Sequence, residues 1–330
     1  MVKIFLSNFN DGISRAEEKN GHFEVTHLIP EKRVRCLAAA PQNPQVIYAG
    51  VSNDGIWISE DTGISWERLA TIKQEIKSIS VNPNNPSEIL AGVKPAGVLR
   101  SKNGGSTWTE MEEFQNIKGR WWWFSPAEPP GITPYVMNVA HSPSEPEKVL
   151  AGVELGAVVR SEDGGETWSN HLSNTLRDCH SLKFHAVDGS YAYEAGGSGG
   201  GASFSRDGGR TWNKVGRKLR RKYGIVCGFD IKDPEIWYIA TASGPGSAFG
   251  KSPTSYLYRR EGGRTWKEIG WQSHPLVDTP TTILERPDYP GHLYAGLQSG
   301  HIMHSSDHGD SWDQLPFKLN GVWFHLISIE

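Results

Sequence analysis

The sequence contains no long apolar run. The first apolar stretch covers only residues 4–6, which is too short for the hydrophobic region of a signal peptide. No later run approaches the roughly 20 residues that a membrane-spanning helix needs. Cysteine is also scarce: Cys36, Cys179 and Cys227 form an odd set without CxxC spacing. We therefore expect free buried thiols in a reducing compartment, a cytoplasmic location and no membrane partner.

An excess of positive charge is also missing. Lysine and arginine total 34 against 37 aspartates and glutamates, a net charge of −3, which gives no electrostatic case for binding nucleic acid. The one basic cluster is RKLRRK at 217–222, which is either a solvated loop or a subsite for an anionic ligand. The segment GKS at 250–252 lacks the glycine spacing of a phosphate-binding loop. We expect no metal and no cofactor.

Glycine and tryptophan are abundant instead, with 37 and 13 residues among 330. One eight-residue segment accounts for six of the tryptophans, which stand at its last position. Its copies are SEDTGISW (59–66), SKNGGSTW (101–108), SEDGGETW (161–168), SRDGGRTW (205–212), RREGGRTW (259–266) and SSDHGDSW (305–312). The starts are 42, 60, 44, 54 and 46 residues apart, a period near that of a four-stranded propeller blade.

Two short apolar strands precede each copy. The nearer strands are VIYAGV (46–51), ILAGV (89–93), VLAGV (149–153), YEAGG (193–197), YIATA (238–242) and LYAGL (293–297). The strands further upstream are VRCLAAA (34–40), IKSISV (76–81), VMNVAH (136–141), CHSLKF (179–184), IVCGFD (225–230) and TTILE (281–285). Each unit is thus predicted to consist of four strands, the last two joined by the repeated segment.

The two chain ends supply a seventh unit. Residues 322–329 are typical of a first strand, and residues 3–9, 12–17 and 23–29 of the second, third and fourth. Phe23 then takes the position of the repeated tryptophan. The sequence predicts an all-β fold, a seven-bladed β-propeller of four-stranded blades in a single domain, 1–330. Blade seven is shared by 1–29 and 322–330, which closes the ring and removes exposed sheet edges.

The repeated segment has three interpretations, as a calcium loop, part of an acidic active site or a tight turn. The glycine pair supplies the positive φ that a hairpin needs, and the acid can accept hydrogen bonds within its own turn. A calcium loop needs a denser series of oxygen ligands. We therefore assign a structural role to the third and eighth residues of the copies: Asp61, Trp66, Asn103, Trp108, Asp163, Trp168, Asp207, Trp212, Glu261, Trp266, Asp307 and Trp312.

These segments resemble the Asp-box, or BNR, repeat S-x-D-x-G-x-T-W. Sialidases, sortilin-type receptor domains, xyloglucanases and a photosystem II assembly factor share it, and the resemblance covers nearly the whole chain. It implies a propeller whose hairpins lie on the face away from the ligand site. The chain is similar to glycosyl-hydrolase-like BNR proteins of uncharacterised function. It lacks the F/Y-R-I-P segment of sialidases, so the resemblance implies the fold and not that chemistry.

The longest loops are expected on the opposite face, where propellers bind ligands. Residues 112–134 contain Arg120, Trp121, Trp122 and Trp123, which form either a packing plug or a stacking platform for a sugar or aromatic ligand. The glycines of 196–201 either let a ligand approach the backbone or make a flexible loop.

First strands line the channel, so their polar residues are candidates for ligand contacts. They are Arg33, Arg35, Arg177, Tyr223 and His325. Asp178 and His180 lie two apart and form either an acid–base pair or a structural contact around a hydrogen-bonded histidine. Tyr193 and Glu194 resemble the nucleophile pair of sialidases, although neighbouring strand residues face opposite ways.

Three functions follow. The leading hypothesis is a monomer that binds a small molecule, such as a carbohydrate or anion, or a protein on the face opposite the hairpins. The second is a glycosidase or lyase acting on an anionic carbohydrate, with Asp178, His180, Tyr193 and Glu194 as catalytic residues. The third is an assembly scaffold.

Overall fold

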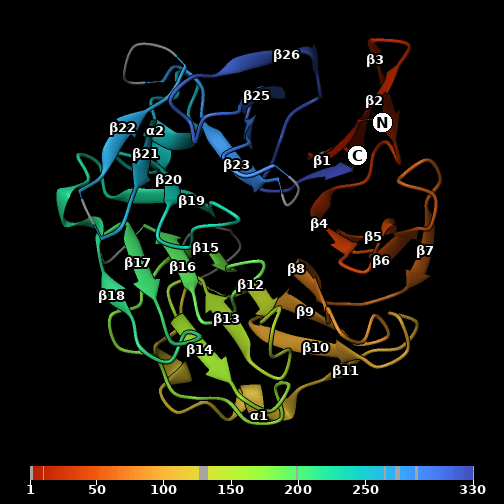
Figure 1. Cartoon of the computed structure of the whole chain (residues 1–330). Helices are drawn as coiled ribbons and strands as arrows, with labels where there is room; N and C mark the ends of the chain where they lie inside the picture. The colour runs from red at the N-terminus through yellow and green to blue at the C-terminus, as the bar shows by residue number, and fades with distance from the viewer. Residues whose placement is uncertain are drawn as a thin grey trace.

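Seven antiparallel sheets stand in a ring, as the sequence predicts (Figure 1). The computed structural model describes residues 3–9, 11–125, 133–197, 200–263, 265–271, 276–286 and 289–329. No helix in these ranges is long and apolar enough to cross a membrane. The first strands of successive blades lie beside one another around the centre.

Blades one to three follow the predicted repeat closely. Their strands are β4 (Val34–Ala40), β5 (Asn43–Val51), β6 (Gly55–Ser59) and β7 (Glu67–Ala70); β8 (Glu75–Val81), β9 (Ile89–Lys94), β10 (Gly97–Ser101) and β11 (Thr109–Glu110); and β12 (Val136–His141), β13 (Val149–Val153) and β14 (Ala157–Ser161). In blade three, Ser169 and Leu172 donate backbone hydrogen bonds to Arg160 (2.7 Å) and Val158 (3.1 Å), so this segment fills the fourth position without forming a regular strand.

Blades four to six have four strands each. They are β15 (Cys179–Phe184), β16 (Ala192–Gly196), β17 (Ala202–Ser205) and β18 (Asn213–Lys214); β19 (Tyr223–Phe229), β20 (Trp237–Ala242), β21 (Tyr256–Arg260) and β22 (Lys267–Ile269); and β23 (Pro280–Glu285), β24 (Leu293–Leu297), β25 (His301–Ser305) and β26 (Asp313–Lys318). The short helices are α1 (Glu112–Gln115), η1 (Arg120–Trp122), η2 (Gly216–Lys218) and α2 (Pro245–Phe249).

The chain ends close the ring in the predicted manner. Strand β27 (Leu326–Ile329) pairs with β1 (Ile4–Asn8), which continues into β2 (Ile13–Lys19) and β3 (His22–Leu28). Phe23 packs against Phe317 of blade six with ring centroids 4.3 Å apart. The phenylalanine therefore joins two blades at the place where the other blades use tryptophan.

The repeated segment forms a hairpin tied together by its own side chains. In 161–168, Asp163 accepts hydrogen bonds from the backbone (2.8 Å) and hydroxyl (2.5 Å) of Thr167, while Ser161 Oγ receives Gly165 N–H (2.7 Å). Asn103 accepts the Thr107 N–H in the same way at 2.9 Å. In the fifth blade an ion pair between Arg259 and Glu261 (2.6 Å) takes the place of the serine–aspartate contact.

The tryptophan of each hairpin packs toward the preceding blade. Trp108 lies against a cluster that includes Tyr48 of blade one, and Trp168 meets Phe114 edge-on at 5.1 Å. Trp212 is buried, whereas the other five are partly buried. Arginines make the reverse connection, from one blade to the next hairpin: Arg15, Arg160 and Arg259 donate to the carbonyls of Thr62, Gly208 and His308 at 3.0, 2.9 and 2.6 Å.

The first strands carry a feature that the sequence analysis did not anticipate. In each of β4, β8, β12, β15, β19 and β23 the register with the next strand skips one residue, a β-bulge. The extra residues are Arg35, Lys77, Met137, His180, Ile225 and Thr281. A bulge re-aims the side chain of its extra residue. In blades one to four the extra residues Arg35, Lys77, Met137 and His180 lie at the channel mouth, whereas Ile225 and Thr281 are fully buried.

The three cysteines are free and buried, as predicted. Burial raises the pKa of the Cys36 thiol to about 12 and that of Cys227 to about 11. Because the thiolate is the reactive form, burial disfavours nucleophilic reactivity in these thiols.

Replacing Asp163 by alanine should lower the free energy of unfolding by about 1–2 kcal/mol, because the backbone and hydroxyl of Thr167 lose their acceptor. Asp163→Asn is the matched control and should cost less than about 0.5 kcal/mol, since Asn103 fills the same position in another hairpin. Urea unfolding measures both. Equal losses in the two variants would contradict the proposed role of the side-chain oxygen.

Acid should weaken the hairpins over a defined pH range. Burial raises the pKa of Asp61, but hydrogen bonds from Ser65, Ser59 and the Ile64 N–H outweigh it and lower the pKa to about 2; the pKa of Asp307 is likewise about 2. An unfolded aspartate has a pKa of about 3.9. The stabilisation is therefore complete above about pH 4 and is lost as the pH falls toward 2.

Melting temperatures measured from pH 5 to pH 2 check this expectation. The variant Asp61→Asn/Asp307→Asn should show a flatter fall than the parent chain below pH 4. Parallel curves for the two proteins would show that these carboxylates do not set the acid sensitivity.

Candidate functional site

A cavity of about 240 Å³ lies at the mouth of the central channel. The bulge residues Arg35, Lys77, Met137 and His180 reach it from four adjacent blades. Aromatic and other side chains complete its lining: Tyr135, Glu154, Tyr223, Pro245, Phe249, Trp323, Phe324 and His325. The cavity thus combines cations, a carboxyl group and apolar rings.

The cations lie in the first strands of blades one and two. Arg35 Nε is 3.1 Å and Lys77 Nζ is 3.2 Å from the two oxygens of Glu75. The Lys77 ammonium also lies 4.6 Å from the centre of the Tyr135 ring. Lys77 is almost fully buried, which is unusual for a lysine and holds the charge in a fixed place.

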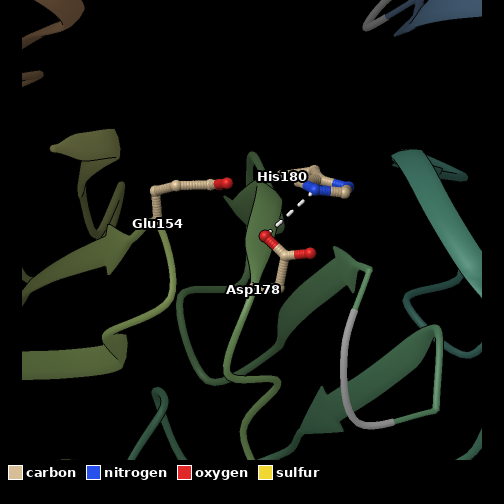
Figure 2. Close-up of side chains that lie close together, drawn as sticks. All are labelled: Glu154, Asp178 and His180. Carbon is tan, nitrogen blue, oxygen red and sulfur yellow. Dashed lines mark ion pairs between the residues drawn. The ribbon is translucent and has the colours of Figure 1, made fainter. Parts of the chain in front are cut away.

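Carboxyl groups and a histidine lie in the neighbouring blades three and four. Glu154 follows β13, and Asp178 directly precedes β15, in which His180 is the bulge residue (Figure 2). His180 Nε2 lies 3.2 Å from Asp178 Oδ1, and its Nδ1 is 2.6 Å from the Gly224 carbonyl oxygen. The donor atoms of the three residues all lie within 4.8 Å of one another.

Asp178 and His180 each stabilise the charged form of the other. Burial lowers the pKa of His180, but the Asp178 carboxylate beside it outweighs burial and raises that pKa above its ordinary value. Burial raises the pKa of Asp178, and the imidazole in turn lowers it below its usual range. In the channel wall, burial lowers the pKa of His325 to about 4, so this ring is neutral at pH 7.

Of the predicted ligand residues, Arg35, Tyr223, His325 and the proposed catalytic His180 share the cavity. The Tyr223 ring lies 4.8 Å from that of His180. Arg33 is exposed and lines a different depression with Asp54 and Glu75. The alternation of strand residues did not distinguish the two arginines, because only Arg35 sits at the bulge.

Tyr193 and Glu194 lie inside blade four, not in the channel-mouth cavity. The Tyr193 hydroxyl donates to the Pro234 carbonyl oxygen (2.9 Å), and Glu194 is fully buried and accepts the Leu176 N–H (2.9 Å). Burial raises the pKa of Glu194 well above its usual range, which favours the neutral acid. A glycosidase mechanism that pairs Asp178 with Glu194 has no support from this geometry.

The insertion between blades two and three divides into a plug and an exposed stack. Trp123 is buried beside Phe114 and donates to His171, and the Arg120 guanidinium lies 5.0 Å from its ring. Trp121 and Trp122 are 78% and 59% exposed and stack on each other at 4.4 Å. Residues 126–132 of the predicted loop lie outside the described residues.

Arg177 contacts the residues of the tryptophan insertion. Its guanidinium donates to the Trp122 carbonyl oxygen at 3.4 Å and lies 5.3 Å from the centre of the Phe124 ring. A second cavity of about 290 Å³ contains Trp122, Trp123 and Arg177. The loop after β13 separates it from the first cavity, since Glu154 lines one and Leu155 the other.

Other loops lie next to this site. The loop after β20 folds into helix α2, whose Phe249 enters the cavity and packs against Trp323 and Phe324 at 5.6 and 5.8 Å. The charged residues of 217–222 are exposed, and Lys222 lies against Gly201. Residues 198–199 of the glycine-rich loop lie outside the described residues.

Sequence reasoning missed eight lining residues: Lys77, Tyr135, Met137, Glu154, Pro245, Phe249, Trp323 and Phe324. Lys77 is the one charged residue of the predicted strand IKSISV, and Glu154 is an acid directly after VLAGV. Trp323 and Phe324 were expected within a strand, but β27 begins only at Leu326. The irregular backbone before it places both rings at the cavity.

The two halves of the tryptophan insertion should respond differently to mutation. Trp123→Ala should destabilise the protein by about 3–5 kcal/mol, because it removes a buried ring. Trp122→Ala should change the unfolding free energy by less than about 0.5 kcal/mol, because that ring is exposed. Urea unfolding of both variants measures these free energies. A large loss of unfolding free energy in Trp122→Ala would show that the exposed stack stabilises the fold.

No protein-family model matches the chain, and no curated protein matches it. Solved structures do resemble it. The GH74 xyloglucanase from Xanthomonas campestris is 18% identical with a TM-score of 0.62, over 86% of this chain and 45% of the xyloglucanase. YCF48 from Cyanidioschyzon merolae is 15% identical with a TM-score of 0.59, over 87% of this chain and 85% of YCF48.

A structure of YCF48 bound to D1 peptide is 13% identical with a TM-score of 0.58, over 85% of this chain and 80% of that one. This chain spans less than half the length of the xyloglucanase. At these identities the similarity shows the β-propeller fold alone.

Proposed function

We propose that this propeller binds a small acidic sugar, or a ligand of similar chemistry, at the channel mouth. The observation that carries the proposal is that Arg35, Lys77 and Glu154 line one cavity together with aromatic rings. Arginine and lysine suit a carboxylate, a carboxyl side chain accepts from hydroxyl groups, and aromatic rings stack on a sugar face. The volume of about 240 Å³ suits a single ring unit, because pockets that bind drug-sized ligands measure about 300–1,000 Å³.

The surroundings support an anionic ligand. The exposed residues Arg217, Lys218, Arg220, Arg221 and Lys222 precede β19, on the face of the ring where that strand starts. Tyr223, the first residue of that strand, lines the cavity. A cluster of one sign near a site raises the local concentration of ligands of the other sign.

The proposal also covers the type of repeat, the domain organisation, the oligomeric state and the location. We infer that the six hairpins are Asp-box repeats and that residues 1–330 form one domain that works as a monomer. The three buried, unpaired thiols favour a reducing, cytoplasmic location. A protein partner remains the second candidate, favoured by the exposed stack of Trp121 on Trp122, since exposed aromatic side chains are enriched at protein interfaces.

Isothermal titration calorimetry with glucuronate tests the proposal. Arg35→Gln should weaken binding at least about tenfold, because a charge-assisted hydrogen bond contributes about 1.5–3 kcal/mol. Arg33→Gln is the matched control: it removes the same charge two residues away, from a side chain that lines another depression. Its affinity should equal that of the parent chain.

The titration is run in EDTA and repeated with galacturonate and N-acetylneuraminate. Loss of affinity in Arg33→Gln as well as Arg35→Gln would indicate general charge attraction and contradict the proposed site. Absence of binding for all three acids would overturn the proposed ligand class.

A further inference from the structure

We propose that Glu154, Asp178 and His180 bind a divalent transition-metal ion of the Zn²⁺ or Mn²⁺ type at the channel mouth. The inference deepens the proposed function and rests on it for the role of the metal, which would hold an oxygen of the ligand. It replaces the expectation from sequence of no metal. No short motif indicates the site, because its residues come from two blades.

The spacing of the donor atoms fits a metal ion. Metal bonds of about 2.1 Å at tetrahedral or octahedral angles put neighbouring ligand atoms roughly 3.0–3.4 Å apart. Asp178 Oδ1 and His180 Nε2 are 3.2 Å apart, and the Glu154 carboxylate completes a set within 4.8 Å. In Figure 2 the two carboxyl groups and the imidazole ring point toward one another.

The orientation of His180 is a second, independent observation. A carbonyl oxygen only accepts hydrogen bonds, so the 2.6 Å contact with Gly224 places a proton on Nδ1. The other nitrogen, Nε2, then faces the two carboxyl groups. Histidine ligands of metals commonly donate their second N–H to a backbone carbonyl, which fixes the ring in this way.

Asp178 supplies a third observation. The residue is nine-tenths buried, and among the described residues its Oδ1 atom receives no hydrogen bond of ordinary geometry, although His180 Nε2 lies 3.2 Å away. Gly197 leaves room for this carboxylate, since a Cβ there would lie 2.0 Å from Asp178 Oδ2.

The chemistry of the donors narrows the metal. Two carboxylates and one imidazole suit Zn²⁺ or Mn²⁺ better than the soft ions that prefer thiolates. Three protein ligands leave at least one coordination position open, and Glu154 and His180 line the cavity. A carboxylate or hydroxyl of the ligand held by Arg35 and Lys77 could occupy that position.

Calorimetric titration of the EDTA-treated, dialysed chain with Zn²⁺ alone tests the site. We expect one ion per chain, and at least about tenfold weaker binding in Glu154→Gln and in Asp178→Asn, which keep the shape of the side chains. His304→Gln is the control: His304 Nε2 lies 3.1 Å from His292 Nδ1, a competing pair of nitrogen ligands on another blade. Its Zn²⁺ affinity should stay unchanged.

Anomalous diffraction at the zinc edge should show a peak between Glu154, Asp178 and His180. A peak at the His292–His304 pair, or a loss of Zn²⁺ affinity only in His304→Gln, would overturn the inference. An absence of Zn²⁺ binding would overturn it too, and would leave Asp178 and His180 as an ion pair without a metal. Glucuronate binding in EDTA with no Zn²⁺ binding refutes the metal site and leaves the proposed function standing. If Zn²⁺ binds but none of the three acidic sugars does, the proposed function is refuted and the metal site stands.

Discussion

One extra residue in the first strand of each of blades one to four is the constraint on which the site depends. The first strands must lie side by side around a closed ring while each blade twists, and a bulge increases the local twist and turns one side chain. Packing between blades holds the strands in place. A Cβ at Gly50 would lie 2.7 Å from Ile76 of the next blade, and one at Gly92 would lie 2.7 Å from Val136. The small residue of the second strand therefore lets the next blade approach.

Two sets of contacts connect the blades farther from the channel. The tryptophan of a hairpin packs on the preceding blade, and three arginines donate to a backbone carbonyl of the following hairpin. The hairpins thus connect the blades at a distance from the channel-mouth cavity. Because the hairpins connect the blades, the loops on the opposite face can differ in length and sequence. Helix α2 and the insertion before β12 are two such loops.

Local patterns made most of the fold predictable. The repeated hairpin and the two apolar strands before it are set by residues close in sequence, so their positions in six blades and the shared seventh blade followed from the sequence. The site was less predictable because it depends on register. Strand alternation treats Arg33 and Arg35 alike, and only the bulge separates them. It also cannot show that Glu194 lies inside blade four while Glu154, at the end of another strand, lines the cavity.

The central claim is that a ligand binds where the bulge residues meet, and Met137 is one of them. The chain has four methionines, and Met303 lies buried in blade six. The most direct measurement is an NMR titration of the protein with ¹³C-labelled methionine methyl groups as glucuronate is added. The account predicts that the Met137 signal shifts in a saturable way while the Met303 signal stays in place. A shift confined to Met111, near the insertion, or an unmoved Met137 signal at saturation would contradict it.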